Sequence, residues 1–262
     1  MSPNAYYNYK KNRKEAYQIA KEVIKAEILD IYHEYDGNPG HRMMKVFLKR
    51  RQITLSKTTT LKYMKELGVR SVVVRKRPRY QKGECYKKFP NHMNQDFTAA
   101  RPNEKWCTDF TYLYLSDGAK RYNCSILDLY DKSIVASING KHITAELAIT
   151  TLNRALNAIP QHKNLMLHSD MGPQFTSQVF TEFCDTHGIE QSMSKAGCLY
   201  DNAPMERFYG TFKGELINKH RFETDEHLNI KVADYVFGYY NHIRPHSSND
   251  YQTPFEKRYL KP

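Results

Sequence analysis

The sequence predicts an α/β protein in which a mixed five-stranded sheet, flanked by helices, follows a small all-α domain. Residues 1–74 contain three apolar patterns of helical length. Residues 106–262 contain three strand-like runs and then alternating helical and strand-like segments. The charge also differs between the two parts of the chain. Residues 1–100 are strongly basic, with 22 Lys and Arg against 9 Asp and Glu, whereas residues 101–262 are nearly neutral, with 18 against 19.

The N-terminal part is expected to form three short helices. Apolar residues recur at helical spacing through 15–35, and a segment containing Pro39 and two glycines ends this pattern. The second helix, 41–51, has a basic exposed side. Ser56 is a candidate N-cap for the third, which ends before Gly68. This order is typical of a helix-turn-helix variant.

Basic residues gather on these helices and on the segment after them. Such an excess in one half of a chain favours a polyanionic partner, most often nucleic acid; a solubilising basic arm is the alternative. We expect residues 75–105 to be a basic linker, whose Pro-containing start is better suited to following phosphates than to packing. The candidate DNA contacts in these regions are Arg42, Lys45, Lys49, Arg75, Lys76 and Arg77.

The second domain, 106–262, begins with three expected strands that turns at Asp117-Gly118 and Asp131-Lys132 join into an antiparallel meander. A helix, a short strand, a further helix and a fifth strand follow, and then two long helices, the first of which carries Glu206. The expected strands are 106–115, 121–129, 132–139, 165–168 and 189–193, and the expected helices are 145–158, 177–188, one through Glu206, and 225–241.

This element order fits a ribonuclease-H-like sheet. A right-handed crossover through helix 145–158 would place the fourth strand parallel to the first. Asp109 in the first strand and Asp170 just past the fourth would then be neighbours, although 61 positions separate them. The following helix would bring Glu206 across the end of the sheet.

Three carboxylates in this arrangement favour a metal site. Asp109 stands in a run of strand formers, where Asp is disfavoured, so either its charge must be compensated or its pKa must be raised. Asp170 considered by itself is better explained as a polar loop residue after a strand. Carboxylates without a Cys and His set of the zinc type suit Mg²⁺, and two such ions support phosphoryl transfer.

Four residues near the triad are candidate DNA contacts: His168, Asn202, Arg207 and Lys213. His168 is equally consistent with an ordinary packed histidine. Asn202 is also a candidate helix cap, and Lys213 lies seven residues after Glu206 on the same helical face. A surface lysine without a special role is the alternative for Lys213.

The sequence disfavours other classes of protein. Its apolar runs are too short to span a bilayer and its N-terminus has no signal-peptide pattern, so an intracellular protein without a membrane partner is expected. The five cysteines are an odd number without a C-x-x-C pair, which favours buried free thiols. A tyrosine recombinase is disfavoured because no arginine-rich catalytic pattern accompanies the tyrosines.

Five stretches carry a family resemblance: 106–112, 168–177, 192–197, 201–206 and 240–246. They resemble the catalytic core of the transposase and retroviral-integrase superfamily that uses an Asp-Asp-Glu triad. More narrowly, the chain resembles the second-frame product of bacterial insertion sequences whose transposase is made by fusing two overlapping reading frames. The role of stretch 240–246 stays open between DNA contact and anchoring of the last long helix.

The resemblance implies that Asp109, Asp170 and Glu206 are catalytic metal ligands for two Mg²⁺ or Mn²⁺ ions. It implies a transposase that cuts double-stranded DNA at the terminal repeats of an insertion sequence and joins the ends to target DNA. A homo-oligomer on DNA, the first-frame product as a further partner, and a bacterial cytoplasmic, nucleoid-associated location are also expected. A DNA-binding regulator or inhibitor of transposition without activity of its own is the alternative.

Overall fold

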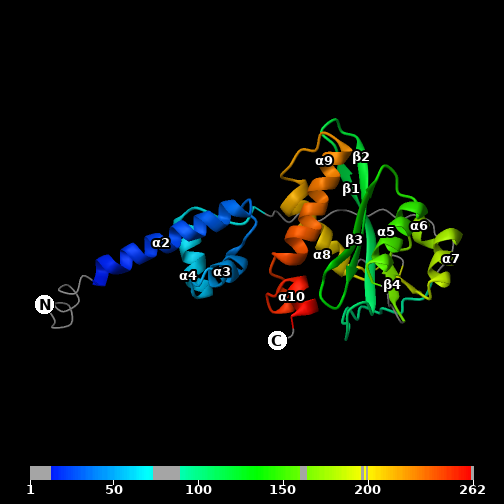
Figure 1. Ribbon diagram of the computed structural model, residues 1–262, viewed down its shortest axis with the longest axis horizontal. Helices are drawn as coiled ribbons and strands as arrows, with labels where there is room; N and C mark the ends of the chain where they lie inside the picture. Colours follow the sequence, from blue (N-terminus) through cyan, green and yellow to red (C-terminus); the bar gives the residue numbers. More distant parts are fainter. Residues whose placement is uncertain (1–12, 73–88, 160–163, 196–197, 199, 261–262) are drawn as a thin grey trace. The chain divides into compact units, whose positions relative to one another are not determined.

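The computed structural model describes residues 13–72, 89–159, 164–195, 198 and 200–260 (Figure 1). The chain divides into two compact units, Met1–Val74 and Arg75–Pro262. Three of the expected DNA contacts, Arg75, Lys76 and Arg77, lie outside the described residues. No helix in the described part of the chain is long and apolar enough to cross a membrane.

The first unit consists of three helices, α2 (Arg13–Glu34), α3 (His41–Arg50) and α4 (Lys57–Glu66). The Ser56 hydroxyl caps α4 by accepting the Thr59 N–H at 3.0 Å. Seven buried apolar side chains from all three helices form one core: Ile28, Ile31, Met44, Phe47, Leu48, Tyr63 and Met64. The helical content expected from the apolar spacing is therefore present, and each helix contributes its apolar side to this core.

The second unit is built on a five-stranded sheet in the order β3-β2-β1-β4-β5. The first three strands form an antiparallel meander, and β4 runs parallel to both β1 and β5. This confirms the predicted mixed, ribonuclease-H-like sheet. The strands are β1 (Lys105–Tyr114), β2 (Lys120–Asp128), β3 (Ile134–Gly140), β4 (Met166–Ser169) and β5 (Glu190–Met193).

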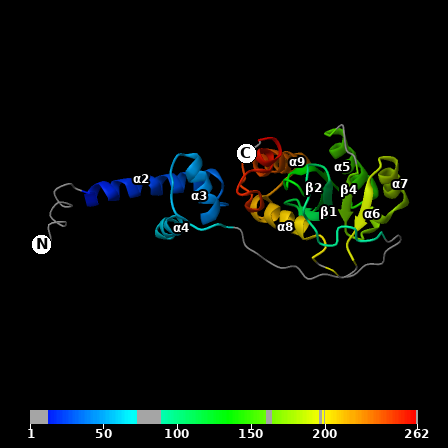
Figure 2. The ribbon, with the colours of Figure 1, turned by 90° about the horizontal axis from the view of Figure 1, so that it is seen from below.

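Helices cover both faces of the sheet (Figure 2). One face is covered by α5 (Ala145–Asn157), α6 (Pro173–Thr176) and α7 (Gln178–Thr186), whose side chains share a core with Trp106. The other face is covered by α8 (Ala203–Phe212), α9 (Asp225–Ala233) and the π-helical segments η1 (Lys213–Ile217) and η2 (Asp234–Tyr240). Cys107 shares that second core, as expected where successive side chains of a strand point to opposite faces.

The helix expected over 225–241 is present, but its second half is the π-helical segment η2. Leu228, Val232, Val236 and Tyr240 are all buried at a spacing of four residues. That spacing exceeds the 3.6 residues of an α-helical turn, so a uniform α-helix would rotate the later side chains away from the sheet. The wider π turns keep them on the buried side.

Residues 89–104, expected to belong to the linker, are irregular but pack against the sheet unit. Met93 is 1% exposed, and its N–H donates to the Ser192 hydroxyl at 3.1 Å. The side-chain amides of Asn91 and Gln95 both donate to the Asp201 carboxylate at 2.9 Å. An irregular segment can be buried in this way because side chains of the sheet unit satisfy its polar groups.

Three described cysteines, Cys107, Cys124 and Cys184, are buried free thiols as expected. Cys198 differs from the expectation because it is exposed, and it also carries no disulfide. Cys85 lies outside the described residues.

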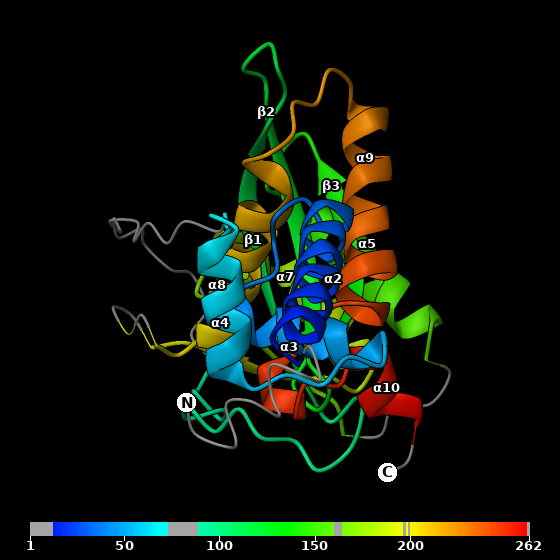
Figure 3. The same cartoon turned by 90° about the vertical axis from the view of Figure 1, so that its left-hand side faces the viewer.

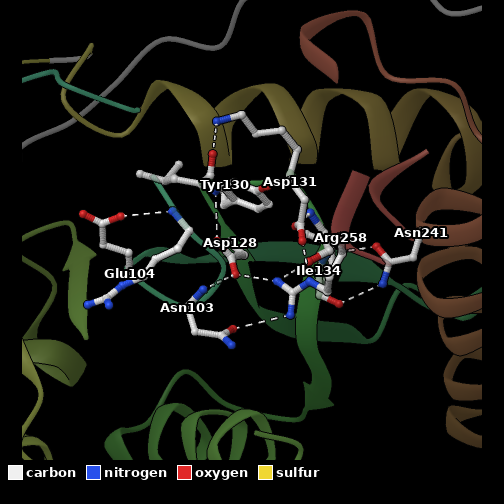
Figure 4. Close-up of polar contacts among 12 residues, drawn as sticks. Asn103, Glu104, Asp128, Tyr130, Asp131, Ile134, Asn241 and Arg258 are labelled. Atoms are coloured by element: carbon white, nitrogen blue, oxygen red, sulfur yellow. Dashed lines mark hydrogen bonds and ion pairs between the residues drawn. The ribbon is translucent and has the colours of Figure 1, made fainter. Parts of the chain in front are cut away.

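A buried polar cluster joins the C-terminal helix α10 (Pro254–Tyr259) to the sheet (Figure 4). The Arg258 guanidinium donates to the carboxylates of Asp128 and Asp131, which are both 0% exposed. Asp128 also accepts the backbone N–H of Asn103 at 2.8 Å. One arginine thus connects α10, the turn between β2 and β3, and the segment that enters β1.

We expect Arg258→Ala to lower the free energy of unfolding by about 3–5 kcal/mol, because it leaves two buried carboxylates without their cation. Urea unfolding followed by circular dichroism measures this change. Exposed Arg221 supplies the matched control, since Arg221→Ala removes the same charge from the surface. Equal stability of the two variants would contradict the importance of the cluster.

A second prediction concerns acid stability. Burial, followed by the nearby charges of Arg244, Lys132 and Arg207, lowers the pKa of His246 from 6.5 to about 4. In the unfolded chain this histidine binds a proton near pH 6.5, whereas in the folded chain it stays neutral until about pH 4. The free energy of unfolding therefore falls as pH decreases from 6.5 to about 4. We expect His246→Gln to reduce the loss of stability between pH 7 and pH 5 in urea titrations. The exposed His142→Gln should leave that loss unchanged.

Candidate active site

The pairing of β1 with β4 brings two of the three predicted carboxylates together. Their parallel register pairs Lys105 with Met166 and continues to Cys107 opposite His168. The same offset places Asp109 opposite Asp170, two residues past the last pair on each strand. Because side chains two positions apart on a strand share a face, Asp109 lies with Cys107 on the face covered by α8, and Asp170 follows directly after the end of β4.

Helix α8 carries Glu206 and is fastened to β1 on both sides of that residue. The Asn202 amide donates to the Thr108 carbonyl at 3.2 Å. The buried Tyr209 hydroxyl donates to the carbonyl of Asp109 itself at 2.6 Å and accepts the Ser125 N–H of β2 at 3.0 Å. These contacts fix the helix that bears Glu206 directly over the strand that bears Asp109.

The environment of Asp109 opposes its negative charge. Burial raises the pKa of the Asp109 carboxyl well above its usual value, and the charges of Asp170 and Glu206 raise it further. The Phe110 N–H, which donates to Asp109 Oδ1 at 2.7 Å, and the Lys213 ammonium act in the opposite direction. The effect of Asp170 and Glu206 on the Asp109 pKa shows that both lie close enough to Asp109 to interact with its charge.

Burial also raises the pKa of Asp170 and of Glu206, although Glu206 is the exposed member of the set. Asp170 Oδ1 accepts the Gly172 N–H at 2.9 Å, which holds the side chain in the tight turn after β4. The Lys213 pKa is lowered by burial, and the Asp109 charge opposes this change. Lys213 is therefore the cation associated with the acidic site.

The donor set fits a hard divalent cation. Carboxylate oxygens are the ligands that Mg²⁺ and Mn²⁺ prefer, and such an ion would relieve the repulsion that raises the pKa of Asp109. Among the described residues, no group of three His, Cys, Asp or Glu side chains is already gathered closely enough to hold a metal ion. The triad is thus a set of neighbouring carboxylates rather than a finished coordination shell.

Two predicted DNA contacts have other partners in the structure. His168 is 0% exposed, and its ring nitrogens lie 2.9 and 3.1 Å from the hydroxyls of Ser192 and Ser194 on the chain segment of β5. Asn202 is buried at the start of α8, where its amide binds β1 and does not cap the helix. Their burial favours structural roles over the predicted contacts, because neither side chain offers surface to DNA in this conformation.

The other predicted DNA contacts that the structure describes are at least partly exposed to solvent. Arg207 is exposed beside Glu206, and Lys213 is half-buried near Asp109. In the helical unit, Arg42 and Lys49 on α3 are exposed, and Lys45 is half-buried.

Sequence reasoning missed two groups that organise the site. The Tyr209 hydroxyl was missed because its position matches the apolar face of a helix, which gives no signal of a polar contact. Glu215 was missed as the partner of stretch 240–246: its buried carboxylate accepts from the Arg244 guanidinium at 2.9–3.1 Å and from the Tyr235 hydroxyl at 2.8 Å. Arg244, which lies in the singled-out stretch 240–246, was the sequence feature from which a buried acidic partner could have been predicted.

The Asn241 side chain completes the anchoring of this stretch. It accepts the Ile134 N–H at 3.0 Å and donates to the Ile134 carbonyl at 2.9 Å, as Figure 4 shows. These contacts favour anchoring of the last long helix over DNA contact for Asn241 and Arg244.

The match to the integrase core domain, together with relatives that are transposases, places the chain in the class of polynucleotidyl transferases. Models of the integrase core domain match residues 99–198 and 187–254, and a model of an HTH-like domain matches residues 18–77. A chain of the simian T-cell lymphotropic virus intasome has a similar fold, with a TM-score of 0.50 at 15% identity over 91% of this chain and 76% of that chain.

Insertion-sequence proteins are similar over nearly the whole chain. The InsK protein of element IS150 from Escherichia coli (strain K12) is 32% identical over 90% of this chain and 82% of its own length. The transposase of element IS904 from Lactococcus lactis subsp. lactis (strain IL1403) is 31% identical over 92% of this chain and 96% of its own length. The chain therefore belongs to the family of insertion-sequence transposases with an integrase core domain, the type found in IS3, and its enzymatic function is that of a transposase.

Proposed function

We propose that Asp109, Asp170 and Glu206 are the catalytic residues and that they hold two Mg²⁺ or Mn²⁺ ions. With these ions the enzyme would cut double-stranded DNA at the ends of its insertion sequence and join the freed 3′-hydroxyl to target DNA. The observation that supports this proposal best is the meeting of three carboxylates from β1, the turn after β4, and α8.

The mechanism needs no nucleophile from the protein. Bound divalent ions supply electrostatic stabilisation to the attacking and leaving oxygens of an in-line displacement. Asp109 in β1 and Asp170 just after β4 would position the reacting phosphate at the end of β4. Glu206, which is exposed on α8, would supply the third carboxylate ligand of the metal ions. The Lys213 ammonium would bind a non-bridging oxygen of the reacting phosphate.

The helical unit, 1–74, would supply further DNA contacts through Arg42, Lys45 and Lys49, and the segment 75–105 through Arg75, Lys76 and Arg77. Bringing two element ends together requires at least two copies of the chain on DNA. A first-frame product would be a further partner in recognising the ends, and a nucleoid-associated bacterial location follows from this role.

The central test is Glu206→Gln, which removes one carboxylate charge from an exposed position and should leave the fold intact. We expect it to reduce Mn²⁺-dependent cleavage and joining of a terminal-repeat duplex about a thousand-fold, because a metal ligand contributes several kcal/mol to the transition state. Chelation by EDTA should abolish the activity of the unaltered chain. The exposed Glu223→Gln is the matched control and should keep full activity; full activity in Glu206→Gln would refute the assignment.

A separate prediction concerns Lys213. If its ammonium holds a phosphate, Lys213→Ala should weaken DNA binding similarly for all sequences and reduce the slope of log Kd against log salt by about 1. Fluorescence anisotropy between 50 and 200 mM salt measures this slope, with the exposed Lys231→Ala of α9 as control. If the slope of Lys213→Ala is unchanged, Lys213 does not contact a DNA phosphate, and its role is limited to the electrostatic interaction with Asp109.

A further inference from the structure

We propose that Asp201 is a positioning residue for the active site and that the chain segment 91–95 holds it in place. Asp201 lies between β5 and α8, five residues before Glu206. Segment 91–95 precedes residue 99, where the match to the integrase core domain begins. The inference rests on the proposed function, because it concerns how Glu206 is held for the metal ions. It extends the active site to a part of the chain outside the matched core domain.

The Asp201 carboxylate is buried and is bound by donors from outside α8. Asp201 is 2% exposed. The Gln95 side-chain amide donates to its Oδ1 at 2.9 Å, and the Asn91 side-chain amide donates to its Oδ2 at 2.9 Å. The Lys195 backbone N–H also donates to Oδ2, at 2.8 Å. These donors are uncharged N–H groups, and they offset the cost of removing a carboxylate from water. Two of them come from segment 91–95.

Asp201 is connected directly to the first turn of α8. The side-chain amide of the next residue, Asn202, donates to the Thr108 carbonyl of β1 at 3.2 Å. The Asn202 carbonyl accepts the backbone N–H of Glu206, also at 3.2 Å. Figures 2 and 3 show that α8 lies alongside β1. A displacement of Asp201 would therefore move the turn that carries Glu206 relative to the strand that carries Asp109.

Segment 91–95 is itself anchored to the core that α8 shares. Met93 is 1% exposed and belongs to the same apolar core as Met205 and Phe208 of α8. Its backbone N–H donates to the Ser192 hydroxyl of β5 at 3.1 Å. The segment is thus attached both to the core beneath α8 and to a strand of the sheet, which makes it a fixed support for Asp201.

The backbone of the segment adopts a conformation that presents its two amides to Asp201. Asn94 and Gln95 have φ angles of 42° and 62°, in the left-handed region that few residues other than Gly adopt. Asn91 Oδ1 accepts the Asn94 N–H at 2.8 Å, which leaves the Asn91 amide group for Asp201. Gln95 is exposed, so burial of its side chain does not explain this conformation. Such backbone conformations persist where surrounding contacts hold them, and they cluster at functional sites.

A contact that contributes only to stability is the alternative. Positioning is favoured because the contacts converge on one carboxylate, and because this carboxylate stands immediately before the helix that bears a proposed metal ligand. Replacing groups that orient a metal ligand without touching the metal commonly costs about 10- to 100-fold in metal affinity. A contact with a stabilising role alone would lower the free energy of unfolding and leave metal affinity unchanged.

The experiment exchanges donor and acceptor across the contact between Gln95 and Asp201. Asp201→Asn places an amide against the Gln95 amide, and Gln95→Glu places a carboxylate against the Asp201 carboxylate, so each single change removes the hydrogen bond. The double variant restores it in the reverse direction, and the second oxygen at position 201 still accepts from Asn91 and Lys195. We expect each single variant to weaken Mn²⁺ binding about ten-fold and the double variant to recover most of this loss.

Two measurements report metal affinity in the full chain. Electron paramagnetic resonance of free Mn²⁺ measures binding without DNA or catalysis. The Mn²⁺ concentration for half-maximal cleavage of a terminal-repeat duplex measures it during the reaction. Asp96→Asn is the matched control, because Asp96 is exposed in the neighbouring chain and pairs with Lys105 instead of Asp201. This control should keep the Mn²⁺ affinity of the unaltered chain. Urea unfolding is recorded for every variant.

Two results would overturn the inference. Unchanged Mn²⁺ affinity in Asp201→Asn would do so even if the free energy of unfolding fell, because the contact would then be only stabilising. Weak binding in both single variants without recovery in the double variant would show that Gln95 does not hold Asp201. If Asp201→Asn does not fold, Gln95→Ala removes one amide from an exposed position without adding a charge. Weaker Mn²⁺ binding in Gln95→Ala supports the proposal, and unchanged binding overturns it.

Failure of the proposed catalytic function is seen separately in Glu206→Gln. If that variant keeps both its activity and its Mn²⁺ affinity, Glu206 is not a metal ligand and the premise fails. If Glu206→Gln loses both while the variants of Asp201 and Gln95 lose neither, the catalytic assignment stands and only this inference fails.

Discussion

The parallel pairing of β1 with β4 is the constraint on which the site depends. Its register, which ends at Cys107 opposite His168, brings Asp109 and Asp170 together when it is continued by two residues on each strand. A slip of one residue would change which face of the sheet the β4 side chains occupy relative to β1. The register is held from the other side of the sheet, where Trp106 and Leu167, directly opposite each other, are both buried in the core with α5 and α7. Apolar packing on one face thus determines the chemistry available on the other.

The segment after α8 completes this arrangement. Glu215 follows Lys213 by two residues, so the buried pair of Glu215 with Arg244 fixes the end of the helix that carries Glu206. A buried carboxylate of this kind is tolerated only with its cation in place. Asn241 binds the start of β3, and Arg258 binds the β2–β3 turn, so both fasten the same C-terminal segment to the sheet. Residues far from the carboxylates in sequence are therefore needed to hold α8 at the correct distance from β1.

The sequence predicted those features that depend on local pattern. Alternating apolar residues, turns and a cap predicted the strands and helices, including the N-cap at Ser56, and the motifs indicated the three carboxylates. It did not predict contacts that arise only after distant segments meet. The Tyr209 hydroxyl on the Asp109 carbonyl and the π-helical segment η2 belong to this class, because a tyrosine or a four-residue spacing on a helix is equally compatible with ordinary packing.

Two groups of acidic residues in the sheet unit differ in the partners that the fold provides. Asp128, Asp131 and Glu215 are each paired with an arginine inside the fold. In the part of the chain that the structure describes, Asp109, Asp170 and Glu206 form no ion pair with Arg or Lys, and burial raises the pKa of each. Charge at these three positions is therefore unfavourable in the protein alone. That cost is the expected property of a site whose charge is compensated by a group from outside the chain.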